Sequence, residues 1–294
     1  MKITIHTPQK AEKFATIFQH LKLLTDHVNM NFSSEGLYMQ CLDNNHCCLF
    51  ECKLTAEWFD DYEFDADTDA PQIGIHAATF YKVINIRQEK QEIEISSEGS
   101  QVDNINIHFT KGDNNFNKSF EIPTIDLESE MMEIPKDETT VDVVIDTKRL
   151  SELASELVLF SEILTLIFSE DGIEFTASGT EGIMKSSIDL DEVNEYAVGE
   201  NMTLKQSYSL KYLNIMCHFG KLSKEISLGF SDERPMHLTY NMDDVKATAQ
   251  ANKDQHNNGD DDDDNGDDDD DNGDDDNTPQ NFVSFYLAPR IEEE

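Results

Sequence analysis

The sequence predicts an α+β fold that is built from two copies of one domain, and three observations support this prediction. The string FSSEGL at residues 32–37 recurs 136 positions later as FSEDGI at residues 168–173. Before each string apolar residues recur with helical spacing, and after it they alternate with polar residues as in a strand. A repeated unit of this kind indicates a duplicated domain.

The segment before each string is predicted to be an amphipathic helix. Apolar residues occupy relative positions i, i+3, i+4, i+7 and i+10, which form one stripe on a helix with about 3.6 residues per turn. The stripe comprises Phe14, Ile17, Phe18, Leu21 and Leu24 in the first copy, and Leu150, Leu153, Ala154, Leu157 and Phe160 in the second. We therefore expect each helix to bury one face.

Strands and a second helix are predicted to complete each copy. Apolar and polar residues alternate after the glycine turns, in residues 37–40 and 173–176, as in an antiparallel meander. Second helical stretches follow at residues 77–87 and 210–219, and each precedes a further strand. Ile93 and Ile226, in these strands, lie 133 positions apart, so the two copies differ slightly in loop length.

An acidic segment without either period joins the copies. Residues 126–138 contain Pro135 and three apolar residues, Met131, Met132 and Ile134, among acidic neighbours. We therefore predict an N-terminal domain at residues 1–125, a connector at residues 126–138 and a C-terminal domain at residues 139–294. The 294 residues are sufficient for two domains that each bury a core.

An Asp-rich tract interrupts the C-terminal domain. Residues 252–280 consist mainly of Asp, Asn and Gly, and they contain too few apolar side chains to offset the entropy of ordering. We predict a disordered insertion, because a strand-like run resumes at residues 282–287. Fourteen aspartates in residues 254–276 account for part of the net charge of -39, and -25 remains elsewhere. An acidic exterior repels nucleic acid, so any DNA contact requires a locally basic face.

The sequence offers no convincing metal or catalytic site. Segments that begin at Asp261 and Asp268 match the first half of an EF-hand calcium loop, but Asn272 and Pro279 stand where the bidentate glutamate belongs. We interpret the tract as a solvated charge run. No phosphate-binding loop, nucleophile elbow or zinc-protease motif occurs, so we predict no enzyme activity, no cofactor and no metal.

The five cysteines favour a reducing, intracellular compartment, because their number is odd and no N-terminal signal segment precedes them. Four of them surround His46 without forming a C-x-x-C pair, so we interpret them as small buried hydrophobes and not as zinc ligands. No apolar stretch approaches the length of about 20 residues that spans a bilayer, so we predict no membrane association.

Four segments together resemble the proliferating cell nuclear antigen family of DNA sliding clamps. They are QCLDNNH at residues 40–46, DGIEFTASG at 171–179, LKYLN at 210–214 and YLAPRIEEE at 286–294. Their order and spacing match the family over essentially the whole chain, apart from the Asp-rich insertion. The resemblance implies a homotrimeric ring around double-stranded DNA, with antiparallel sheets outside and two helices per domain lining the channel.

The resemblance also implies a set of basic channel residues. The candidates are Lys22, Lys82, Arg87, Lys148, Arg149, Lys211, His218 and Lys221. The chain departs from the family at positions that are often basic, namely Ala15, Thr16, Asn85, Glu152 and Ser155, and in a loop that contains Asp65, Asp67 and Asp69. We therefore expect a weakly basic channel. Any one of these cations could instead be an ordinary solvated surface residue.

A front-face groove is implied for short peptides of polymerases, flap nucleases, ligases and the clamp loader. The residues carried over are Leu42, His46, Met132, Ile134, Pro235, Ala288 and Pro289. Methionine adapts its shape, which suits a groove that accepts several clients, although the apolar connector residues could also pack beneath a loop. Subunit closure is expected through edge strands at residues 118–122 and 182–188, with Pro123 shortening the first. Glu170 replaces a lysine that is modified in eukaryotic relatives, so that regulation is expected to be missing.

The leading hypothesis is a homotrimeric replication and repair clamp that acts in the nucleus or in a viral replication compartment. Two alternatives remain open: a subunit of a heterotrimeric checkpoint or transcription clamp, and an acidic ion-binding or scaffold protein in which the Asp tract is the working part. The Ala288-Pro289 pair and His46 favour the replication role.

Overall fold

The computed structural model describes residues 1–65, 72–97, 102–112, 116–128, 131–134, 139–199, 201–232, 234–243 and 280–290. Apart from Gln280, the Asp-rich insertion predicted at residues 252–280 lies outside the described residues. So do Asp67 and Asp69 of the acidic loop.

The two halves of the chain repeat one order of elements. The first contains β1 (Lys2–Ile5), α1 (Pro8–Leu21), β2 (His27–Ser33), β3 (Gly36–Leu42), β4 (Cys48–Thr55), η1 (Ala56–Trp58), β5 (Asp61–Glu63), β6 (Gln72–His76), α2 (Ala77–Ile84), β7 (Glu92–Ser96), β8 (Asn104–Thr110) and β9 (Lys118–Pro123). The second contains β10 (Val141–Asp146), α3 (Thr147–Leu157), β11 (Ile163–Ser169), β12 (Gly172–Gly179), β13 (Gly182–Ile188), η2 (Leu190–Glu192), β14 (Glu195–Val198), β15 (Leu204–Ser209), α4 (Leu210–Cys217), η3 (His218–Lys221), β16 (Glu225–Phe230), β17 (Met236–Asn241) and β18 (Phe282–Leu287). The predicted duplicated α+β fold is confirmed.

Some predicted boundaries need correction. The second helices end earlier than predicted, at Ile84 and Cys217, and a turn or 3₁₀ helix continues each of them. After Ile84 the N–H groups of Ile86 and Arg87 donate to carbonyl oxygens three residues back, and after Cys217 the 3₁₀ helix η3 has the same tighter winding. Pro123 does not shorten β9, because it pairs with Asn104 as the last residue of that strand.

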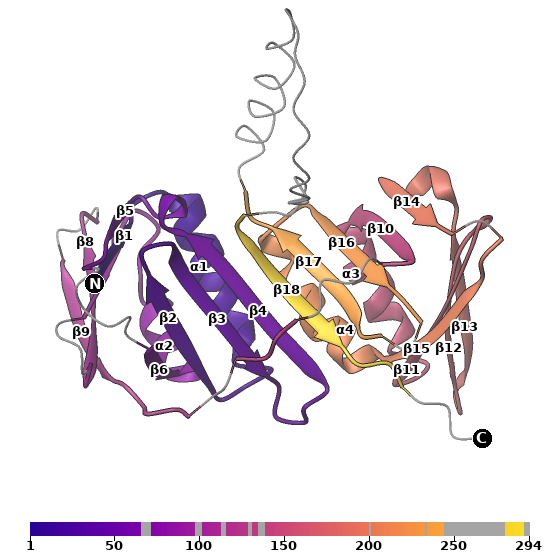
Figure 1. Cartoon of the computed structure of the whole chain (residues 1–294), viewed down its shortest axis with the longest axis horizontal. Coiled ribbons are helices and arrows are strands. Elements are labelled where there is room, and N and C mark those ends of the chain that lie inside the picture. The colour runs from indigo at the N-terminus through magenta and orange to yellow at the C-terminus, as the bar shows by residue number, and fades with distance from the viewer. Residues whose placement is uncertain are drawn as a thin grey trace, which may run out of the picture.

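The strands form three antiparallel sheets (Figure 1). One sheet has the order β5-β1-β7-β8-β9, and another has the order β13-β12-β11-β15. The third crosses from one half of the chain to the other, in the order β14-β10-β16-β17-β18-β4-β3-β2-β6. The crossing point is the pairing of β18 with β4, in which Phe285 lies opposite Phe50.

The sheet orders repeat as well. The part β14-β10-β16-β17-β18 has the same order as the separate sheet β5-β1-β7-β8-β9, and β4-β3-β2-β6 has the same order as β13-β12-β11-β15. By this correspondence β9 and β13 are the counterparts of β18 and β4. Whereas β18 and β4 pair with each other, β9 and β13 each have one neighbour and therefore one open edge among the described residues.

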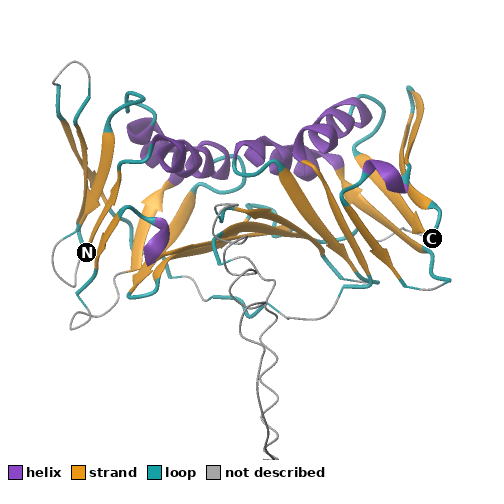
Figure 2. Ribbon diagram, turned by 90° about the horizontal axis from the view of Figure 1, so that it is seen from above, coloured by secondary structure: helices purple, strands orange, loops and turns teal. Residues whose placement is uncertain are grey.

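All four α-helices lie on one concave side of the molecule, and the sheets lie behind them (Figure 2). Phe14 and Phe18 of α1 are fully buried, and the ring of Phe18 lies 4.4 Å from that of Phe80 in α2. Asp146 caps α3 by accepting a hydrogen bond from the backbone N–H of Arg149. The predicted apolar stripes are buried except at Leu153 and Phe160, which are half-buried.

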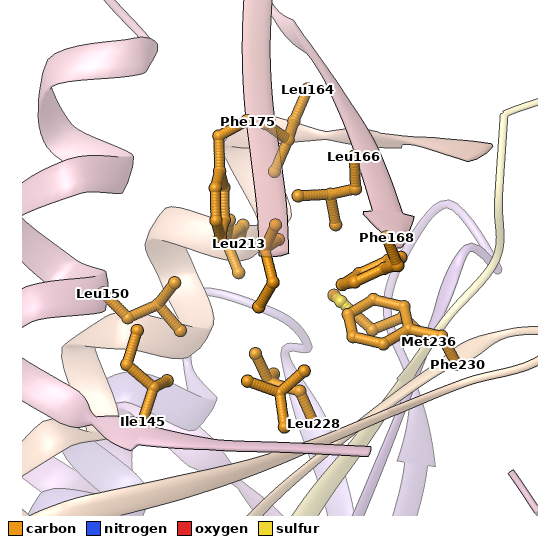
Figure 3. A pocket seen from close by; sticks show the side chains of 12 residues that line it. Ile145, Leu150, Leu164, Leu166, Phe168, Phe175, Leu213, Leu228, Phe230 and Met236 are labelled. Atoms are coloured by element: carbon orange, nitrogen blue, oxygen red, sulfur yellow. The ribbon is translucent and has the colours of Figure 1, made fainter. Parts of the chain in front are cut away.

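The core of the C-terminal half leaves no space for a ligand. Its void of about 10 Å³ is surrounded by apolar side chains such as Leu150, Leu166, Phe168 and Met236 (Figure 3). This is about the volume of one water probe, and a water there would lack polar partners. This void is therefore not a candidate ligand site.

Candidate functional site

The predicted channel residues lie on or next to the four helices. Lys22 caps the C-terminus of α1 with its Nζ 4.2 Å from the ring centroid of Tyr81, and Lys82 is exposed on α2. Lys148 is 84% exposed at the start of α3, and Lys211 is exposed in the first turn of α4. The four α-helices that these lysines lie on or next to share the concave side (Figure 2).

Two predicted channel residues connect the halves of the chain. Lys221 pairs with Glu12 of α1 at 3.1 Å, and the ring of His218 stacks on His20 at 5.5 Å. Burial first, and then the neighbouring His218 and lysines, lower the pKa of His20 to about 4. His20 is therefore neutral at physiological pH, and this seam contributes less positive charge than its side chains suggest.

The two predicted channel arginines are held by other contacts. Arg87 is half-buried and donates to the carbonyl oxygens of Gln88, Glu89 and Gln91, and burial lowers its pKa. Arg149 forms an ion pair with Glu192 at 2.6 Å. Both guanidinium groups thus brace loops of their own half of the chain.

Thr16 needs a correction. It was expected at a channel position that is often basic, yet it is 2% exposed and its hydroxyl donates to the carbonyl oxygen of Glu12. A side chain at this position faces the core, so Thr16 removes no charge from the helix surface. Asn85, Glu152 and Ser155 are exposed, as a channel position requires.

A groove of about 340 Å³ lies between the connector and the outer face of the nine-stranded sheet. Of the seven predicted groove residues, Leu42 and Met132 line it. The residues that the sequence reasoning missed are Thr25, His27, Val28, Asn29, Gln40, Cys41, Leu49, Leu127 and Glu128. Strand alternation could have identified Gln40, because residues two apart on β3 point to the same face as Leu42.

The other predicted groove residues lie at the ends of nearby strands. His46 is exposed in the turn between β3 and β4 with φ 57°, and Pro235 is exposed just before β17. Ala288 follows β18, and its N–H donates to the carbonyl oxygen of Cys47 at 3.0 Å. This bond places the C-terminal segment against the turn that carries His46. Ile134 and Pro289 are half-buried.

Three neighbouring strands hold the connector and the residue that precedes it. The N–H of Ile125 donates to the carbonyl oxygen of Gly74 at 2.8 Å, and a Cβ at Gly74 would stand 2.1 Å from the carbonyl oxygen of Ile125. The Asn29 amide donates to the carbonyl oxygen of Leu127 at 3.1 Å. The side-chain amide of Gln40 donates to the carbonyl oxygen of Met132 and accepts from the N–H of the same residue. The connector is therefore fixed by β2 and β3, and β6 holds the residue just before it.

The turn beside the groove is organised by Asp43, which is 3% exposed. Its carboxylate accepts from the backbone N–H groups of Asn45, Cys47 and Cys48 and from the hydroxyl of Tyr212 in α4. Burial would raise the pKa of Asp43, but these hydrogen bonds outweigh it and lower the pKa. The groove turn is thus tied to a helix of the other half.

Exposed apolar side chains gather at the two open edges. Phe116 is 73% exposed just before β9, and Ile86 is beside that strand because its carbonyl oxygen accepts from Lys118. At the other end Ile183 of β13 and Leu159, which precedes β11, are 63% and 72% exposed. Large exposed apolar residues that lie together indicate an interaction surface.

The cysteines differ in their environments. Of the four cysteines predicted to be buried, Cys48 and Cys52 are buried and Cys41 is half-buried, whereas Cys47 is exposed and the prediction is wrong there. Cys217 is buried as well. Among the described residues, no group of three or more His, Cys, Asp or Glu side chains is arranged to hold a metal ion. In the same residues, no helix is both long and apolar enough to cross a membrane.

Comparison with known proteins gives a consistent result. Residues 8–131 match the family model described as proliferating cell nuclear antigen, N-terminal domain, and residues 133–251 match that of the C-terminal domain. The chain is 25% identical to proliferating cell nuclear antigen 1 of Plasmodium falciparum over 95% of this chain and 93% of that protein. It is 24% identical to proliferating cell nuclear antigen of Dictyostelium discoideum and 22% identical to that of Chaetomium thermophilum, over 80% of this chain and 93% and 91% of those proteins.

Proposed function

The chain belongs to the proliferating cell nuclear antigen family, and from this premise we propose that it is a DNA sliding clamp that tethers replication and repair enzymes. The observation that carries the proposal is the placement of all four helices on one concave side, with open sheet edges at both ends of the molecule (Figure 2). Such an arc can close only by contact with further copies. Three copies complete the ring.

The repeated sheet order specifies how the copies meet. Within one chain β18 pairs with β4, and Phe285 lies opposite Phe50. The repeat places Phe120 of β9 at the position of Phe285, and Met184 of β13 at the position of Phe50. We therefore expect β9 of one subunit to pair with β13 of the next, with Phe120 opposite Met184. Such a head-to-tail contact rotates each subunit relative to the one before it. A closed ring forms when a whole number of these rotations makes one full turn.

The same correspondence favours a homotrimer over the heterotrimeric checkpoint or transcription clamp. Both halves of the joint, β9 and β13, are present in this one chain, and apolar side chains are exposed next to both. No second kind of subunit is required to close the ring. Burial of Phe116, Ile183 and Leu159 in the joint would remove three large, exposed apolar side chains from water.

Enclosure explains how so acidic a protein can hold DNA. A closed ring retains a duplex without base contacts, so the channel needs only enough positive charge to accept the phosphate backbone. Lys22, Lys82, Lys148 and Lys211 supply this charge on the helices, whereas the exterior with its net negative charge disfavours DNA elsewhere. A clamp of this kind holds no catalytic group, in keeping with a non-enzymatic role.

The groove between the connector and the nine-stranded sheet is proposed to bind short peptides of polymerases, flap nucleases, ligases and the clamp loader. Its floor contains Leu42 and Leu49, and Met132 forms part of its connector wall. A volume of about 340 Å³ is sufficient for one or two aromatic side chains. The cited relatives come from cellular eukaryotes, which supports action in the nucleus and does not support a viral compartment.

The ring joint is tested by disulfide trapping. In a Cys47→Ser background, Phe120→Cys combined with Met184→Cys should be oxidised to a covalent closed trimer, because directly opposed residues of antiparallel strands approach within disulfide range. Phe120→Cys with Lys185→Cys, shifted by one residue, is the control and should give little product. Equal yields from the two pairs would contradict the proposed joint.

The clamp activity is tested by light scattering and by primer extension on circular DNA. We expect a trimer, and longer products when the chain is loaded before the polymerase starts. Deletion of residues 254–276 should preserve both results, whereas a scaffold that depends on the Asp tract would lose its activity. A chain that stays monomeric at micromolar concentration and leaves product length unchanged would refute the proposal.

A further inference from the structure

A single carboxylate in β4 bonds side chains from both strands that neighbour β4 in the nine-stranded sheet. Oε1 of Glu51 in β4 accepts from the hydroxyl of Tyr38 at 3.0 Å, and Oε2 accepts from the hydroxyl of Tyr286 at 3.1 Å. Tyr38 belongs to β3, and Tyr286 belongs to β18 in the other half of the chain. Glu51 therefore bridges the seam at which the two halves share a sheet.

The first arm of this network leads to the connector. The Gln40 amide donates to the hydroxyl of Tyr38 at 3.1 Å and also to the carbonyl oxygen of Met132 at 3.0 Å. The N–H of Met132 in turn donates to Oε1 of Gln40 at 2.7 Å. The two bonds hold Met132 as a sheet neighbour would hold it, although it is 92 residues away in the sequence.

The second arm leads to the C-terminal segment that follows β18. Tyr286 stands two residues before Ala288, whose N–H is bonded to Cys47 in the turn beside the groove. The ring of His237 stacks on Tyr286 at 4.5 Å with an interplanar angle of 6°, and Nε2 of His237 lies 2.9 Å from the hydroxyl of Thr239. Burial lowers the pKa of His237 to about 4, so the ring is uncharged at physiological pH where it stacks on Tyr286.

Both tyrosines remain hydrogen-bond donors at physiological pH. Burial, together with the charge of Glu51, raises the pKa of Tyr38 and of Tyr286. Hydrogen bonds to a charged acceptor are stronger than neutral ones and fix geometry more tightly. The network lies on the same face of the sheet as the groove floor, since Gln40 and Glu51 are each two residues from the lining residues Leu42 and Leu49.

We propose that Glu51 and Gln40 are positioning residues of the peptide groove: Glu51 ties Tyr38, which supports Gln40, to β18 of the other half of the chain, and Gln40 fixes the Met132 backbone in the connector wall. The inference rests on the proposed peptide-binding function. A preorganised groove binds its peptide more tightly because less chain entropy is lost on binding. Loss of the network should therefore weaken peptide binding without affecting ring assembly, whose edges β9 and β13 belong to other sheets.

The test uses the full chain with three substitutions and one matched control. Gln40→Leu removes both bonds to Met132 at nearly constant size, and Tyr38→Phe and Tyr286→Phe each remove one bond to Glu51. Tyr62→Phe is the control, because its hydroxyl donates to Ser33 and Gly36 in another part of the N-terminal half. The probe is a fluorescein-labelled synthetic peptide with an aliphatic residue and, one 3₁₀ turn later, two adjacent phenylalanines.

Two measurements distinguish an effect on the connector from an effect on peptide binding. Hydrogen exchange at the Met132 amide reports the connector without any peptide, and fluorescence anisotropy reports peptide affinity. We expect Gln40→Leu to accelerate exchange and to weaken the peptide about tenfold, in line with the loss of one or two net hydrogen bonds. Each network tyrosine variant should have a smaller effect in the same direction, and Tyr62→Phe should have none. Light scattering should give a trimer for all four.

Three results would overturn the inference. Unchanged exchange in Gln40→Leu would show that the amide does not hold the connector. Faster exchange with peptide affinity within twofold of wild type would show that the connector position does not govern binding, while the proposed function stands. If the wild-type chain does not bind the peptide, the groove function itself fails and the inference fails with it; disulfide trapping and primer extension still report on the ring.

Discussion

Lys221 and Glu12 form an ion pair of 3.1 Å across the seam between the two halves of the chain. In the repeated domain Gln88 occupies the position of Lys221, which lies 133 residues later in the chain. Lys148 occupies the position of Glu12, which lies 136 residues earlier. The proposed joint between subunits therefore repeats the seam within the chain but lacks its ion pair. Lys148 is positive where Glu12 is negative, and Gln88 is neutral where Lys221 is positive.

Gln88→Glu should strengthen the subunit joint. The new carboxylate would face Lys148 of the neighbouring subunit, which is 84% exposed and has only a 3.7 Å contact with Glu152 of its own helix. An exposed pair contributes about 0.2–1 kcal/mol, so subunit exchange should slow by up to about fivefold. Exchange is measured by mixing trimers with donor and acceptor dyes. Gln88→Lys is the opposite control and should accelerate exchange, and both effects should disappear in about 1 M salt.

Tyr212→Phe should destabilise the fold while leaving its packing intact. The substitution removes the hydroxyl that donates to Asp43 and accepts from Asn45, so a buried carboxylate loses one of its donors. We expect the free energy of unfolding to fall by about 1–3 kcal/mol, as measured by urea denaturation at one fixed protein concentration. Tyr81→Phe removes an exposed bond to Asn85 and should change little. Equal effects of the two substitutions would refute a special role for the Asp43 contact.

His20 should make the stability of the clamp sensitive to mild acid. An unfolded histidine titrates near pH 6.5, whereas burial lowers the pKa of His20 to about 4 in the folded chain. The unfolded state therefore binds the proton first. The contribution of neutral His20 to the free energy of unfolding is therefore fully present above pH 6.5, and it is lost as the pH falls towards 4. His20→Phe retains a ring against His218 and removes the titration, so its free energy of unfolding should decline less between pH 6.5 and 4. Parallel curves for wild type and variant would contradict this explanation.

Periodicity and repetition were sufficient to predict most of the fold. The apolar stripe around Phe14 predicted α1, and the run at residues 282–287 matches β18. The two strands that the family resemblance places at the subunit contacts are sheet edges among the described residues. The ends of the second helices were wrong because their last turns tighten, which the apolar spacing does not record.

The site was less accessible to sequence reasoning, because its contacts join residues that are far apart in the chain. Strand alternation places Gln40 on the outer face, but it does not show that the amide meets Met132. In the same way, a basic residue at a channel position reveals nothing about a partner such as Glu192, which holds Arg149. Thr16 shows the opposite error, since a family position was taken as surface although the side chain is buried.

The cations of the channel should contribute unequally to DNA retention. Lys211 is exposed on α4 and has an aromatic contact, with its Nζ 5.9 Å from the ring centroid of Tyr212. Arg149 is held at 2.6 Å by Glu192 and by the carbonyl oxygen of that residue at 2.8 Å. A phosphate must compete with those partners to reach Arg149, whereas it displaces only water and a weak contact at Lys211.

Lys211→Ala should therefore shorten the lifetime of loaded clamps on circular DNA more than Arg149→Ala does. Each phosphate contact that is lost should reduce the slope of log affinity against log salt by about 0.9, so Lys211→Ala should also give the shallower salt dependence. The lifetime is measured from labelled clamps on circles across a series of salt concentrations, with linear DNA to report sliding off the ends. A steeper loss for Arg149→Ala would mean that DNA breaks the Glu192 pair and that the channel reaches further around α3. Enclosure would still dominate retention in that case, because neither variant opens the ring.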